Sequence, residues 1–102
     1  MIREDYNEIT YATLKRCLLN AQYVLVDIRS VYEYRQYHIK GAISIPEHEL
    51  FTRMKELKKD KTYIFICQKG KNSKDVAITL AGYGYKTINL KDGMNGISKC
   101  GE

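Results

Sequence analysis

The sequence of 102 residues has no tryptophan, a single proline and no long apolar run. A membrane-spanning helix needs about 20 consecutive apolar residues, and the first residues carry acids where a secretion signal would be apolar. With 44% hydrophobic and 28% charged residues, the composition is that of an ordinary folded chain. We therefore expect one domain over residues 1–102 that is cytoplasmic and has no membrane partner.

Cysteine is scarce and widely spaced. Cys17, Cys67 and Cys100 form an odd set, which does not suit a disulfide framework. No CxxC, HxxxH or CxxH pair occurs, so we expect no bound metal. In a reducing compartment each thiol is a core residue, a bystander or a nucleophile. Cys17 fits the apolar face of a helix, and Cys100 is either a bystander or a resolving thiol.

The basic excess is concentrated in one segment. Residues 53–74 contain eight lysines or arginines and two acids, whereas the whole chain has 17 basic and 12 acidic residues. Tyrosines are spread along the chain and do not alternate with this lysine run, so nucleic-acid binding would rest on charge alone and is not expected. We predict that Arg53 to Lys61 is solvated surface directed away from Cys67, and that Lys69 and Lys71 lie beside that cysteine.

Two continuous apolar runs predict strands that are buried on both faces. They are Val24–Val26, followed by Asp27, and Tyr63–Ile66, followed by Cys67. Runs of this kind are typical of parallel sheets covered by helices on both sides. Shorter strands are expected at residues 42–45 and 86–90.

Helical patterns separate these strands. Apolar residues recur at helical spacing after Thr10, which can act as an N-cap, and again over residues 49–58. A further helix is predicted over Ser73–Ala81, ending at Gly82 or Gly84. Strands alternating with helices over this length indicate an α/β fold with a mainly parallel sheet.

Cys67 occupies the carboxyl end of a predicted buried strand, which is where parallel sheets bind ligands. Gly70 permits a positive φ, so the N–H groups of the following loop can turn inward around an anion. Those amides, a helix N-terminus and two nearby lysines all favour the thiolate, which is the form that attacks. The alternative is a cysteine that merely ends a strand, and the glycine and lysines of the loop favour the nucleophile.

The order and spacing of three motifs resemble those of rhodanese-like domains. The first runs from Asp27-Ile28-Arg29 to the turn at His38 to Pro46. The second, Cys67 to Ser73, looks like the active-site loop of that family, and the third, Gly84 to Gly93, is similar to its closing segment. The resemblance covers residues 9–97.

The resemblance implies an α/β fold with a five-stranded, mainly parallel sheet flanked by helices on both faces, and sulfurtransferase activity without a cofactor. The catalytic Cys67 would take a sulfane sulfur from thiosulfate or a small persulfide, hold it as a persulfide, and pass it to a thiol or cyanide acceptor. A sulfur-relay protein is a candidate partner. The implied substrate-binding residues are Gln68, Lys69, Gly70, Lys71, Asn72 and Ser73, with Asp27 and Arg29 in support.

Three departures from the family pattern stand out. Asn72 replaces a common arginine, Asp92-Gly93 replaces a common glycine pair, and Ile97 replaces a frequent tryptophan. Loss of the arginine removes a bidentate anion clamp, so we expect weak thiosulfate turnover or a preference for a persulfide donor. The Asn72 amide can still donate one hydrogen bond and cap the following helix.

Two other functions stay open. A non-catalytic rhodanese-like interaction module is one, although such modules tend to lack the cysteine that this chain has. A tyrosine phosphatase is the other, but its mechanism needs an arginine six positions after the cysteine, where this chain has Ser73. Outside the loop we expect structural roles for Glu33 and His38 and a surface position for His48.

Overall fold

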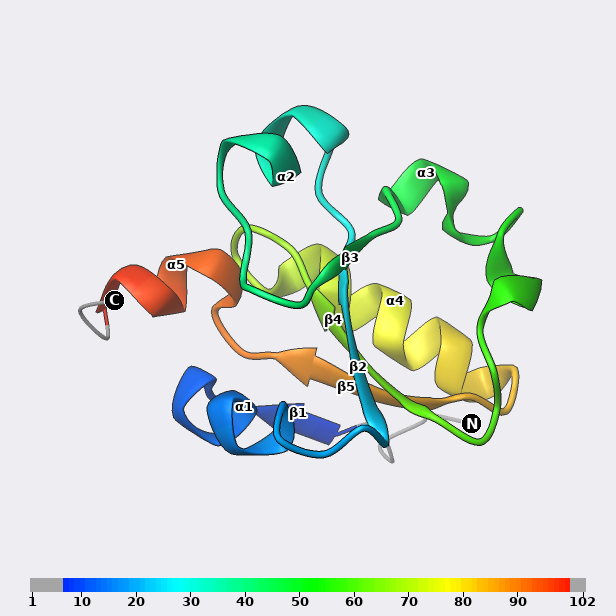
Figure 1. Ribbon diagram of the computed structural model, residues 1–102. Coiled ribbons are helices and arrows are strands. Elements are labelled where there is room, and N and C mark those ends of the chain that lie inside the picture. Colours follow the sequence, from blue (N-terminus) through cyan, green and yellow to red (C-terminus); the bar gives the residue numbers. More distant parts are fainter. Residues whose placement is uncertain (1–6, 100–102) are drawn as a thin grey trace.

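The apolar runs of the sequence form the centre of a five-stranded sheet in the computed structural model, which describes residues 7–99 (Figure 1). The strand order is β1-β5-β4-β2-β3, and neighbouring strands in this order are parallel to each other. This arrangement confirms the predicted α/β fold. The strands are β1 (Asn7–Ile9), β2 (Tyr23–Asp27), β3 (Ile43–Ser44), β4 (Thr62–Ile66) and β5 (Lys86–Leu90).

Short helices connect the strands. The predicted cap of the first helix is confirmed, because the Thr10 hydroxyl accepts the amide of Thr13 at 3.3 Å. Within residues 7–99, none of the helices is long and apolar enough to span a bilayer. The helices are α1 (Tyr11–Cys17), α2 (Val31–Gln36), α3 (Glu47–Leu50), the 3-10 helix η1 (Met54–Glu56), α4 (Lys71–Gly82) and α5 (Gly93–Lys99).

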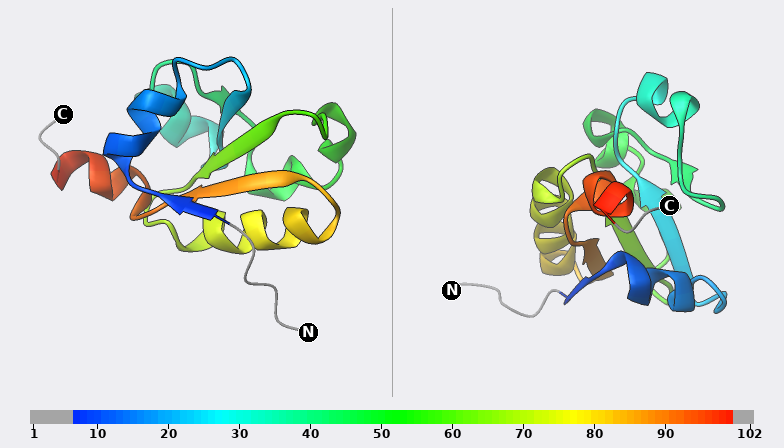
Figure 2. Two further views of the ribbon diagram at one scale, coloured as in Figure 1. Left: turned by 90° about the horizontal axis from the view of Figure 1, so that it is seen from below. Right: turned by 90° about the vertical axis from the view of Figure 1, so that its left-hand side faces the viewer.

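Alternate residues of the central strands pack into two cores, one on each face of the sheet. Leu25, Ile64 and Ile88 lie in the core that contains α1 and α5, with Cys17 packed at its margin. The neighbouring Phe65 lies in the other core, which contains α4. Figure 2 shows α1 and α4 on opposite sides of β5. Because both faces are covered, the strands need continuous apolar sequence.

The helix predicted over residues 49–58 is wrong. The chain forms α3, a turn through Phe51 to Arg53, and then η1. The Thr52 hydroxyl donates to the carbonyl oxygen of Glu49 at 2.8 Å, and the Arg53 amide is shared between the carbonyls of Glu49 and Leu50. Side-chain competition for helix carbonyls of this kind disfavours a regular helix.

Helix α5 begins directly against the backbone that follows β4. Gly93 has a φ of 55°, and a Cβ built on it would lie 2.2 Å from the carbonyl oxygen of Cys67. The amides of Met94 and Asn95 donate to the carbonyls of Cys67 and Gln68, each at 3.0 Å. No side chain therefore fits at Gly93, which explains the glycine of the closing segment.

We predict that Gly93→Ala lowers the free energy of unfolding by at least about 2 kcal/mol, because the methyl group displaces α5 and strains a positive φ. Gly82→Ala is the matched control. No atom lies within 4 Å of a Cβ added at Gly82, so the free energy should change by less than about 1 kcal/mol. Equilibrium urea unfolding measures both, and equal midpoints would contradict the close contact of α5.

Candidate active site

The Cys67 sulfur lies inside a ring of hydrogen-bond donors at the end of β4. The amide nitrogens of Gly70 and Ser73 donate to Sγ at 3.1 and 3.3 Å, and the Ser73 hydroxyl oxygen lies 3.2 Å from it. The residue is only 6% exposed. Two backbone amides and one side-chain hydroxyl therefore surround the sulfur.

The loop that makes this ring is shorter than the sequence predicts. Helix α4 begins at Lys71, two residues before the predicted start, and Gly70 is its N-cap with a φ of 89°. Asn72 therefore lies in the first turn of the helix and does not cap it, so that prediction is wrong. The early start places the amide of Ser73 close to the sulfur.

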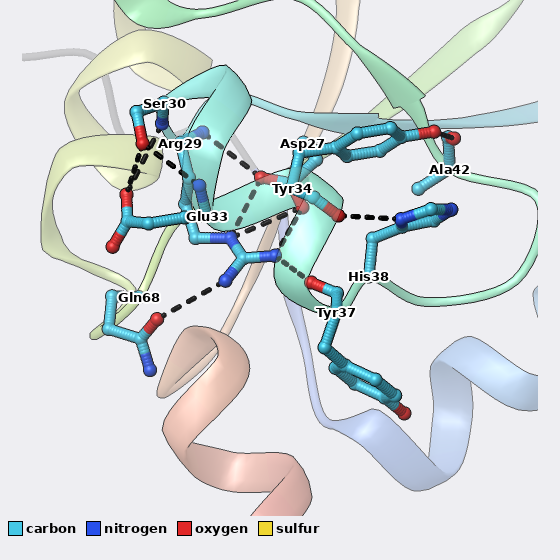
Figure 3. Close-up of polar contacts among 9 residues, drawn as sticks. All are labelled: Asp27, Arg29, Ser30, Glu33, Tyr34, Tyr37, His38, Ala42 and Gln68. Atoms are coloured by element: carbon cyan, nitrogen blue, oxygen red, sulfur yellow. Dashed lines mark hydrogen bonds and ion pairs between the residues drawn. The ribbon is translucent and has the colours of Figure 1, made fainter.

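Arg29 connects the loop to the end of β2 (Figure 3). The fully buried Asp27 carboxylate accepts from Arg29 Nε at 3.0 Å and from Nη2 at 2.8 Å. Arg29 also donates to the Tyr37 carbonyl at 2.6 Å and to Gln68 Oε1 at 3.4 Å. Gln68 in turn donates to Asn95 Oδ1 at 2.7 Å. Asp27 thus holds Arg29, and Arg29 holds the first residue of the loop.

The segment around α2 stabilises this end of the sheet (Figure 3). Ser30 and Glu33 form a capping box, in which each side chain accepts the backbone amide of the other. His38 is stacked on Tyr34 at 3.8 Å between ring centroids, and its Nδ1 donates to the Tyr34 carbonyl at 2.8 Å. Glu33 and His38 therefore have the local contacts expected of structural residues.

Two openings reach Cys67. A hollow of about 350 Å³ is lined by Lys69 and Lys71 together with Cys67, Gln68 and Asn72. A larger cleft of about 980 Å³ lies on the side of α2 and α3. Among the residues lining this cleft are Arg29, Val31, Phe51, Glu33, Glu47, His48 and Glu49. Lys69 and Lys71 thus line one opening at Cys67, and the carboxylates of Glu33, Glu47 and Glu49 line the other.

Three residues of the basic segment make contacts away from Cys67. Arg53 donates hydrogen bonds to the carboxylates of Glu56 and Glu49, which raise the pKa of Arg53, and the Arg53 guanidinium lowers the pKa of Glu56. Lys59 lies over the Tyr85 ring, 5.2 Å from its centroid, and Lys61 donates to a backbone carbonyl. None of these basic residues lines an opening to Cys67, whereas Lys69 and Lys71 do.

Asn89 and Glu8, which the sequence analysis does not single out, also belong to this site. Asn89 is fully buried in β5, and its side-chain oxygen accepts from the Ser73 hydroxyl at 2.5 Å. Its nitrogen donates to Glu8 on β1 at 2.8 Å and to the Gly70 carbonyl at 3.2 Å. The available signal was an asparagine within the shorter strand predicted at residues 86–90, because a polar side chain that is buried in a strand needs a partner.

Two of the family departures have a structural explanation. Asp92 takes a φ of 64°, a left-handed conformation that aspartate tolerates better than most residues with a side chain. Ile97 is 4% exposed within the α1 and α5 core.

Within residues 7–99, no group of three His, Cys, Asp or Glu side chains could hold a metal. Cys100 lies outside the described residues.

The chain was also compared with proteins of known sequence and structure. It is 34% identical over 91 residues to the Bacillus subtilis protein named "Putative sulfurtransferase YtwF", with 88% of each chain covered. It is 34% identical over 90 residues to a sulfurtransferase of Allochromatium vinosum, covering 86% of this chain and 84% of that one. A tRNA sulfurtransferase of Pyrobaculum aerophilum matches over 74 residues at 34% identity, which is 72% of this chain and 15% of that protein.

The fold comparison agrees. The crystal structure of a rhodanese-related protein from Thermoplasma volcanium superposes with a TM-score of 0.84 at 28% identity, and 92% of this chain covers 93% of that one. The family model described as rhodanese-like domain matches residues 10–100, which include both the Cys67 loop and the closing segment. The chain therefore belongs to the family of rhodanese-like domains.

Proposed function

We propose that this protein is a sulfurtransferase that carries a sulfane sulfur on Cys67, taken from thiosulfate or a low-molecular-weight persulfide and passed to a thiol or cyanide. The observation that carries the proposal is the position of Cys67, whose Sγ accepts hydrogen bonds from two loop amides and which lines a hollow together with Lys69 and Lys71. Two relatives that align with most of this chain are named sulfurtransferases, which supports the same class of reaction.

The reaction proceeds by two displacements at sulfur. In the first, the Cys67 thiolate attacks the outer sulfur of thiosulfate, so that an S–S bond forms to Cys67 while the S–S bond of thiosulfate breaks. Sulfite departs with the electron pair of that bond. In the second, an acceptor thiolate or cyanide attacks the outer sulfur of the persulfide and releases Cys67 as a thiolate. Each step breaks one S–S bond and forms one new bond to the transferred sulfur, and the leaving group keeps the electron pair, so no oxidant, reductant or cofactor is required.

Each loop residue has a role in this scheme. The Gly70 and Ser73 amides stabilise negative charge on Cys67, and the exposed Lys69 and Lys71 attract an anionic donor to the hollow. Gln68 keeps its place through Arg29, and Asn72 lines both openings. Asp27 and Arg29 are thus supporting residues that hold the loop in shape.

The larger cleft suits the acceptor. Its volume exceeds that of the hollow, and exposed Val31 and Phe51 give it apolar surface next to the acidic Glu47 and Glu49. A thiol carried on another protein would gain contact area there, whereas a small dianion would be repelled by the carboxylates. The relative named tRNA sulfurtransferase makes a sulfur-relay protein a reasonable acceptor class.

We predict that the protein gains the mass of one sulfur atom on incubation with thiosulfate or glutathione persulfide, because Cys67 retains the transferred sulfur. Cyanide should remove that mass. Intact mass spectrometry measures both steps. Cys67→Ala should gain nothing, and Cys17→Ala, which alters a half-buried thiol away from the loop, should behave as the natural chain. If neither donor produces an adduct, the result would favour a non-catalytic interaction module.

We predict that Asn72→Arg raises kcat/KM for thiosulfate about tenfold, because a guanidinium at the rim of both openings supplies two charge-assisted hydrogen bonds to the donor's oxyanions. Asn72→Lys is the matched control, since it adds the same charge without the planar fork. Steady-state production of sulfite or thiocyanate measures the effect. If the two variants are equally active, charge alone and not bidentate geometry limits thiosulfate use.

A further inference from the structure

Asn89 is a buried polar residue that reaches the candidate active site without touching Cys67. It lies in β5 between the buried Ile88 and Leu90 and is 0% exposed. Its side-chain oxygen accepts from Ser73 Oγ at 2.5 Å, and its nitrogen donates to Glu8 at 2.8 Å and to the Gly70 carbonyl at 3.2 Å. Asn89 therefore connects β1 to both residues whose amides face the sulfur.

The direction of these hydrogen bonds is fixed by their partners. The Glu8 carboxylate and the Gly70 carbonyl can only accept, so the Asn89 nitrogen must face them and its oxygen must face Ser73. Ser73 has a single hydroxyl hydrogen, and Asn89 takes it. The Ser73 oxygen, 3.2 Å from Cys67 Sγ, is then left to accept the proton of the thiol.

The sulfur and Asn89 consequently compete for one hydrogen. When Cys67 is a thiol, its S–H donates to Ser73 and the Ser73 hydroxyl donates to Asn89. When Cys67 is a thiolate, Sγ has no proton to give and is a better acceptor than the neutral amide, so the hydroxyl turns toward it. Ionisation of Cys67 must therefore break the hydrogen bond between Ser73 and Asn89.

We propose that Asn89, held in place by Glu8, is a positioning residue that restrains ionisation of Cys67 by competing for the Ser73 hydroxyl proton. This inference rests on the proposed function in that a thiolate is the reactive form. Alkylation of Cys67 needs no sulfur donor, so a failure of sulfur transfer and a failure of this inference are separate results.

The central experiment compares Asn89→Leu in two backgrounds. Leucine has a similar size and accepts no hydrogen bond, so the Ser73 hydroxyl becomes free to donate to the thiolate. We expect iodoacetamide to modify Cys67 about fivefold faster at pH 7. The curve of alkylation rate against pH should also move to lower pH. Site-resolved peptide mass spectrometry separates Cys67 from the other thiols. In a Ser73→Ala background, Asn89→Leu should change nothing.

The sign of the effect separates competition from damage to the loop. Asn89→Asp presents a stronger acceptor to Ser73, so we expect slower alkylation, opposite to the leucine variant; a distorted loop would move both in the same direction. Neither variant alters the charged groups that line the openings to Cys67, although Asn89→Asp adds a charge beside Glu8. Those groups are Arg29, Glu33, Glu47, His48, Glu49, Lys69 and Lys71.

Exposed Glu8 supplies a test that does not disturb the core. Glu8→Ala removes one acceptor of the Asn89 nitrogen and should accelerate alkylation of Cys67 by about twofold, whereas Glu8→Gln retains an acceptor and should match the natural chain. Circular dichroism establishes that each variant is folded. The inference is overturned if Asn89→Leu accelerates alkylation equally with and without the Ser73 hydroxyl. It is also overturned if alkylation is unchanged in Asn89→Leu or unchanged in Glu8→Ala.

Discussion

The candidate site depends on closing a very short loop around one sulfur atom. Only Cys67 to Gly70 lie between the end of β4 and the start of α4, yet the amides of Gly70 and Ser73 both reach Sγ. This closure requires the positive φ of Gly70, where a Cβ would lie 2.7 Å from the backbone nitrogen of Asp92. Gly70 thereby permits both the turn and the donor ring.

Three carbonyls of the loop are bonded to neighbouring segments, while two amides face the sulfur. The carbonyls of Cys67 and Gln68 accept from the first turn of α5, and the Gly70 carbonyl accepts from Asn89. The amides of Gly70 and Ser73, which belong to other peptide units of the same stretch, donate to the sulfur. The donors around Cys67 therefore lie on a loop whose backbone is held in place by α5 and Asn89.

The sequence predicted the centre of the fold and the loop, but not the contacts that close the site. Continuous apolar runs and a glycine-lysine loop are local signals, and they located β2, β4 and Cys67. Strand β1 was missed because its three residues are mostly exposed, and α5 because its sequence is rich in glycine and polar residues. The pair of Glu8 and Asn89 spans 81 positions, so no local pattern could reveal it.

The placement of charge also had to come from the structure. Net charge suggested a basic surface, but Arg53 is paired with Glu49 and Glu56, so its charge is balanced locally. At the two openings to Cys67, lysines line the hollow and carboxylates line the cleft. In the proposed reaction the same sulfur atom is loaded by an anionic donor and emptied by a thiol or cyanide acceptor. Oppositely charged approaches can separate these two half-reactions without any movement of Cys67.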